Sequence, residues 1–80
     1  MQECRVLETH VFYQPTEQIV IDAPDDGIVY SDHEHITIVP QVVRKGANKV
    51  MAIRNAKLVT VQAGEVVGIV MPFATVKGKK

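Results

Sequence analysis

Turn-forming residues recur along this chain at intervals of roughly eight to twelve residues, and this spacing is the strongest constraint on its fold. Apolar runs are interrupted by Pro15, the segment 23–27 (APDDG), Pro40, the segment 44–48 (RKGAN) and Gly64. No window of useful length places its apolar residues at helical spacing. The rhythm predicts an all-β fold, a small sandwich or barrel whose strands are mainly antiparallel.

The runs between these turns are rich in β-branched residues, which favour strands. The pattern predicts strands over 3–13, 17–22, 27–30, 35–39, 49–54, 57–62 and 66–71. A length of 80 residues is typical of one domain. We therefore expect a single β domain over residues 1–76, followed by a solvated basic tail over residues 77–80.

The stretch 50–71, VMAIRNAKLVTVQAGEVVGIVM, contains the most apolar of the predicted strands. Strict alternation along its last run places Ile69 and Met71 with Val67 on one face, and Val66 with Val70 on the other. A strand that is apolar on both faces needs cover on both, and in so short a chain a second copy can supply part of it. We therefore predict a homo-oligomer with an interface at Val59, Val61, Val67, Ile69 and Met71.

The net charge of zero conceals a division between the two halves of the chain. Residues 1–40 contain one arginine and eight carboxylates, a net charge of −7, whereas residues 41–80 contain eight cations and one carboxylate, a net charge of +7. The halves can neutralise each other within one molecule, form a self-complementary surface between copies, or present a basic face to a polyanion.

A basic face would make the protein a nucleic-acid-binding module, which is the first alternative function. Its phosphate contacts would come from the cations of the second half, namely Arg44, Lys45, Lys49, Arg54 and Lys57. Single-strand binders also stack bases on aromatic side chains, and the basic half contains only Phe73.

The segment 32–35, Asp-His-Glu-His, is the one cluster with the side chains of a metal site. His33 and His35 would project to the same side of a strand, and His10 could approach them in space. Imidazole and carboxylate groups are ligands for zinc and similar metals. The second alternative is therefore a small-ligand or metal-binding domain.

Nucleophilic catalysis has no candidate in this sequence. Ser31 is the only serine, Cys4 is the only cysteine, and neither lies in a nucleophile motif. No glycine-rich loop of the phosphate-binding kind is present, since Gly64 and Gly68 are isolated. We predict that the protein is not an enzyme and uses no cofactor.

No apolar run reaches the ~20 residues that a membrane helix needs, and the N-terminal segment MQECRVLETH lacks the apolar core of a signal peptide. We therefore expect no membrane partner, and a location in the cytoplasm or within an assembled particle.

The segments VLETHVFYQPTEQIVI and ITIVPQVVRKGANKVMAIRNAKLVTVQAGEVVGIV resemble a β-rich segment near the protease of retroelement Gag–Pol polyproteins. The pattern falls on Asn55, Val59, Val61, Gly64, Val67 and Gly68. A similar hairpin closes the barrel of trimeric dUTPases, whose catalytic aspartate and glycine-rich motifs this chain lacks. The resemblance implies a β-rich module of viral or mobile-element origin without dUTPase activity.

The segments IDAPDDGIV and VQAGEVVGIV also resemble parts of biotinyl and lipoyl carrier domains. Those domains have a modified lysine a few residues before the alanine-proline pair, and residues 14–18 contain no lysine. Taken together, the residues favour a non-catalytic structural, assembly or adaptor module that forms a homo-oligomer through apolar strands.

Overall fold

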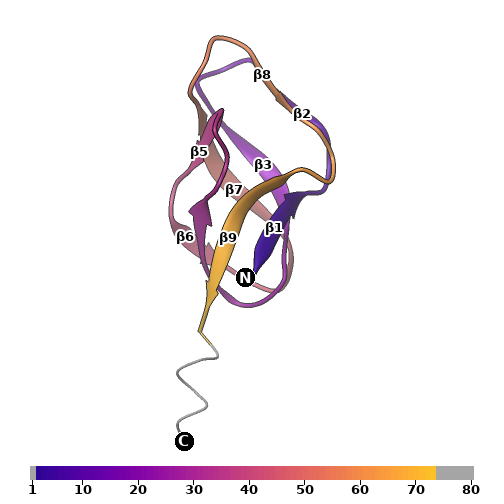
Figure 1. The fold of residues 1–80 in the computed structure, drawn as a ribbon, viewed down its shortest axis with the longest axis vertical. Helices are drawn as coiled ribbons and strands as arrows, with labels where there is room; N and C mark the ends of the chain where they lie inside the picture. The colour runs from indigo at the N-terminus through magenta and orange to yellow at the C-terminus, as the bar shows by residue number, and fades with distance from the viewer. Residues whose placement is uncertain (1, 74–80) are drawn as a thin grey trace, which may run out of the picture.

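The computed structural model describes residues 2–73 and confirms the all-β prediction. Nine strands form within this range (Figure 1): β1 (Glu3–Val6), β2 (His10–Phe12), β3 (Thr16–Ala23), β4 (Gly27–Ser31), β5 (Ile36–Ile38), β6 (Gln41–Val43), β7 (Gly46–Arg54), β8 (Val59–Val61) and β9 (Val66–Pro72). The basic tail expected over residues 77–80 lies outside the described residues.

Seven strands form one antiparallel sheet in the order β5-β7-β3-β1-β9-β4-β6, which curls into a half-barrel. The remaining two, β2 and β8, form a separate antiparallel ribbon. The ribbon extends beyond the barrel on the side away from the N-terminus (Figure 1).

The two edge strands of the large sheet are consecutive pieces of one extended segment, residues 36–43. Its first part, β5, pairs with β7, whereas its second part, β6, pairs with β4. Pro40 stands between them, where the missing backbone N–H interrupts a ladder. The segment thus changes partner at Pro40 and brings the two edges of the curled sheet together.

Two side-chain amides bridge β6 and its following turn to β7, where no backbone ladder forms. Gln41 uses its Oε1 and Nε2 atoms to bond the N–H and carbonyl of Met51, both at 3.4 Å. Asn48 bonds the N–H of Arg44 at 3.1 Å and the carbonyl of Arg44 at 2.6 Å. Each amide therefore reproduces the paired donor and acceptor of a backbone rung.

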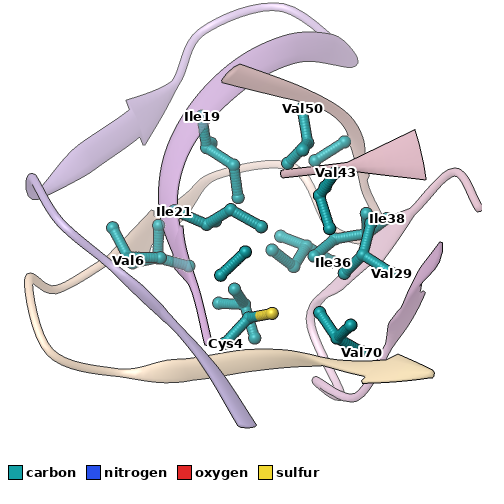
Figure 2. Close-up of a cluster of buried hydrophobic side chains, with 14 of the residues drawn as sticks. Cys4, Val6, Ile19, Ile21, Val29, Ile36, Ile38, Val43, Val50 and Val70 are labelled. Atoms are coloured by element: carbon teal, nitrogen blue, oxygen red, sulfur yellow. The ribbon is translucent and has the colours of Figure 1, made fainter. Parts of the chain in front are cut away.

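Most residues of the core are β-branched valines and isoleucines, several of which converge in Figure 2. Phe12 is its one aromatic member, and it reaches the core from the ribbon. Cys4 lies at the centre with no exposed surface, and burial, followed by the negative charge of Asp22, raises the pKa of its thiol to about 11. No polar or charged residue of the described range is buried.

The inward and outward faces of β9 differ from strict alternation. Cys4 pairs with Gly68 and Arg5 with Val66, so Val67 is an extra residue opposite β1 and forms a bulge. Val67 and Val70 are both buried, whereas Ile69 and Met71 face outward. The prediction that Val67 shares a face with Ile69 and Met71 is therefore wrong, because the bulge shifts the alternation by one residue.

The other local differences involve short elements. The strand expected over 3–13 is two strands in different sheets, because residues 7–9 bend between β1 and β2. The turn expected over 44–48 is shorter, since β7 already begins at Gly46. Strand β6 was not predicted, because three residues beside a proline give too short a pattern to recognise.

Candidate interaction surface

The outward side chains of β9, β4 and β6 form a continuous apolar surface. Ile28 pairs with Met71 on one side and with Val42 on the other, and Tyr30 pairs with Ile69 in the next row. We call these five residues the outer apolar face. Met71 and Val42 are each 62 % exposed, and Tyr30 is 43 % exposed. Directly opposite residues on adjacent strands have side chains in contact distance, so the five make one patch.

Close packing of the strands beneath this face depends on Gly68. A side chain there would bring its Cβ to 2.7 Å from the Tyr30 carbonyl oxygen, inside any normal contact. Gly68 pairs with Ser31 of β4 and Cys4 of β1, at the bulge of β9. The glycine therefore lets β9 lie between its two neighbours while Ile69 and Met71 stay outside.

The outer apolar face contains two of the five residues predicted for an oligomer interface. Ile69 and Met71 belong to it. Val59, Val61 and Val67 are at most 6 % exposed, because this chain's own strands cover them. A second copy cannot reach these three valines in this fold. Sequence reasoning missed Ile28, Tyr30 and Val42, whose only signal was their place in a two-residue repeat.

Each of the three histidines pairs with a different glutamate, and the His35 Nε2–Glu34 Oε2 distance is the longest, at 3.8 Å. His10 Nε2 donates to Glu17 Oε1 at 2.7 Å, and His33 Nε2 lies 3.3 Å from Glu65 Oε2. His33 Nδ1 also accepts the His35 N–H at 3.0 Å. Among residues 2–73 no three His, Cys, Asp or Glu side chains gather in a way that could hold a metal. The structure brings the His33 and His35 rings together, with 5.8 Å between their centroids, but His10 does not join them in a group of three.

Glu17 and Glu65 fix turns through the backbone. Glu17 Oε2 accepts the N–H groups of Tyr13 at 2.8 Å and Gln14 at 2.6 Å. Glu65 Oε1 accepts the Gln62 N–H at 2.7 Å. The Gln14 and Gln62 amides are the largest causes that hold the pKa of Glu17 and of Glu65, respectively, below the ordinary 4.5, with smaller contributions from His10 and His33. These glutamate contacts hold the two turns in their conformations.

The five basic residues do not form one patch. Arg44 and Lys45 lie beside the β3–β4 turn, where the Lys45 N–H donates to Asp26 Oδ1 at 2.8 Å. Arg54 is the last residue of β7 and Lys57 follows it, at the end of the strand about 26 Å from Gly46 for a strand of this length. Within residues 2–73 none of these cations, Lys49 included, makes an ion pair.

The charged halves of the sequence are interleaved in space. Strands β1, β3 and β4 of the acidic half pair with β9, β7 and β6 of the basic half. The sheet topology thus places the two charged halves side by side within one molecule, the first of the three arrangements that the charge division allows.

Within residues 2–73 no pocket opens on the surface and no helix has the length and apolar character needed to cross a bilayer. Comparison with family models, with curated proteins and with solved structures gave no match for this chain. The likeness to the retroelement segment stays a prediction from the residues, and the candidate site rests on the surface chemistry alone.

Proposed function

We propose that the protein is a non-catalytic assembly module whose copies associate through the outer apolar face. The observation on which this depends is the row formed by Val42, Ile28 and Met71, three apolar side chains adjacent across three strands. The five positions of the face contain no charge. Contact with another apolar surface would remove these side chains from water, and this burial stabilises the contact by about 25 cal/mol for each Å² of apolar surface buried.

A second copy of the chain is the occupant that the properties of the molecule favour. A chain of 80 residues has a small core, and small domains commonly gain stability by association. Because the net charge is zero, two copies do not repel each other through their overall charge. The same face on two copies is apolar on both, as a two-fold symmetric contact requires.

The test is the mass in solution, measured by analytical ultracentrifugation up to high micromolar concentration at two salt concentrations. We expect the wild-type chain to be oligomeric at both salt concentrations, because the five positions of the contact contain no charge that salt could screen. Met71→Ser and Val42→Ser should each shift it toward the monomer, because each places a hydroxyl in the contact.

Met51→Ser is the matched control for Met71→Ser. Met51 is also an exposed methionine, at 39 %, but it lies on β7, outside the outer apolar face. It should leave the mass unchanged. A wild-type chain that remains monomeric over the whole concentration range contradicts the proposal, as does dissociation by Met51→Ser with no effect of Met71→Ser.

A further inference from the structure

The connections at the far end of the β2–β8 ribbon form a projecting surface that the outer apolar face does not include. We call residues 13–16 and 55–58 the tip; they follow β2 and precede β8, and they lie together at the top of Figure 1. All eight residues are exposed. The tip adjoins the ends of β3 and β7, where Thr16 pairs with Ile53 and the Arg54 N–H donates to the Pro15 carbonyl at 2.8 Å.

Two large apolar side chains lie on the tip, each next to the last rung of the ribbon. That rung pairs Phe12 with Val59; Tyr13 directly follows Phe12 and Leu58 directly precedes Val59. Tyr13 is 75 % exposed and Leu58 is 72 % exposed, the highest values among the large apolar residues of the described chain. Their ladder neighbours Phe12 and Val59 are buried, so the apolar character runs from the core out to the tip.

The charge of the tip is positive. Among its eight residues Lys57 is a cation and none is a carboxylate. Arg54 lies at its base and donates from Nη1 to the Ala56 carbonyl at 2.7 Å. The nearest carboxylate in sequence, Glu17, is 19 % exposed and bonds to His10 and to the amides of Tyr13 and Gln14. With Lys57 and Arg54 against this one carboxylate, the tip and its base keep a net positive charge.

We propose that the tip binds the surface of an anionic lipid bilayer, with Tyr13 and Leu58 in the interface and Lys57 among the headgroups. A convex tip with two apolar side chains cannot supply the roughly 800 Å² per partner of a stable protein contact. A bilayer encloses a convex tip on all sides, and tyrosine and leucine with a neighbouring lysine match its interfacial layer. The contact is peripheral and spans nothing.

Binding of this kind does not require association of the copies. An oligomer would nevertheless present several tips at once and bind more tightly than one copy. The opposite end of the molecule differs, because there the carboxylates of Asp25 and Asp26 lie beside Lys45 and the half-exposed Phe73. The protein is thus chemically different at its two ends.

The test is flotation of the full chain with vesicles of phosphatidylcholine and phosphatidylserine, in parallel with vesicles of phosphatidylcholine alone. We expect the full chain to bind the anionic vesicles. Tyr13→Ser with Leu58→Ser should lower the affinity by at least about tenfold, because two apolar side chains no longer enter the interface. Lys57→Glu should lower it roughly fivefold on the anionic vesicles only.

Leu7→Ser is the control, because Leu7 is 46 % exposed but precedes the opposite end of the ribbon ladder. All variants change exposed positions, so equal melting temperatures should confirm that they are folded. Failure of the wild type to float with anionic vesicles overturns the proposal. Equal vesicle binding by the double serine variant and the wild type also overturns it. So does a double serine variant that no longer self-associates in the absence of vesicles, because the tip would then be a contact between copies.

Discussion

At the scale of single residues, Glu17 and Glu65 use one carboxylate for two tasks. Each accepts the backbone amides of a turn with one oxygen and contacts a histidine with the other. Charge-assisted bonds of this kind are stronger than neutral ones, which lowers the pKa of both carboxyls. The histidines that invite a metal-site interpretation in the sequence serve here to orient these glutamates.

The lowered pKa of Glu17 predicts a specific pH dependence. A carboxylate whose pKa is lower in the folded state stabilises the fold above its unfolded value near 4.5, and this stabilisation is lost as the pH falls through the folded pKa. Glu17→Gln should therefore lower the melting temperature at pH 6–7 and differ less from the wild type as the pH falls below about 4.

Melting curves between pH 3 and pH 7 measure this effect, with roughly one pH unit between points. Glu8→Gln is the matched control, because Glu8 is an exposed carboxyl on the connection between β1 and β2. A Glu17→Gln variant as stable as the wild type at neutral pH would show that the turn does not need the charge.

At the scale of elements, the partner change at Pro40 replaces part of a ladder by side chains. Gln41 and Asn48 stand in for backbone groups between β6 and β7. Such bonds contribute about 0.5–1.5 kcal/mol each. Asn48 has the shorter contacts of the two amides, so it should contribute more.

Asn48→Asp tests this contribution with a minimal change of shape. The variant keeps an acceptor for the Arg44 N–H but loses the donor to the carbonyls of Arg44 and Gly46. We expect its free energy of unfolding to fall by about 2 kcal/mol, since two bonds are lost. Urea unfolding followed by circular dichroism measures the difference.

Asn55→Asp is the matched control, because Asn55 uses its side-chain oxygen to accept the Thr37 hydroxyl at 3.2 Å and the variant retains that acceptor. It should change the stability little. Equal losses in both variants would show that added negative charge, and not the missing donor, is the cause.

The sequence predicts the bounds of β3, β4 and β9 to within one residue at each end. It fails where the deciding contact lies far away in the chain. The bulge at Val67 depends on the register of β9 against β1, and the exposure of Val42 depends on which strand follows Pro40. The outer apolar face combines residues from three strands that are far apart in the chain, from Ile28 on β4 to Met71 on β9. Alternation within single strands therefore could not predict it.

At the scale of the whole molecule, the fold depends on contacts between distant parts of the chain. Strand β1 lies between β3 and β9, and Cys4 at its centre touches no water. A thiol in this position reacts only after the sheet opens, and its pKa of about 11 also keeps it protonated at neutral pH. Its reactivity therefore reports opening of the barrel.

Labelling of Cys4 by a disulfide reagent at pH 8 should be at least about a thousandfold slower in buffer than in concentrated urea, as for domains stable by 5 kcal/mol or more. If the barrel opens globally, Asn48→Asp should increase the labelling rate about tenfold for each 1.4 kcal/mol by which it lowers the free energy of unfolding. Rapid labelling of the native wild type would show instead that β1 detaches locally.

The partner change at Pro40 also limits how copies of this protein can polymerise. An open sheet exposes a row of unpaired amides and carbonyls, and such rows recruit further strands into fibres. Here the outermost strands are adjoining pieces of one segment, and Gln41 and Asn48 occupy the backbone groups beside it. The large sheet therefore offers no long template for strand addition, which leaves its side-chain faces as the surfaces through which copies can associate.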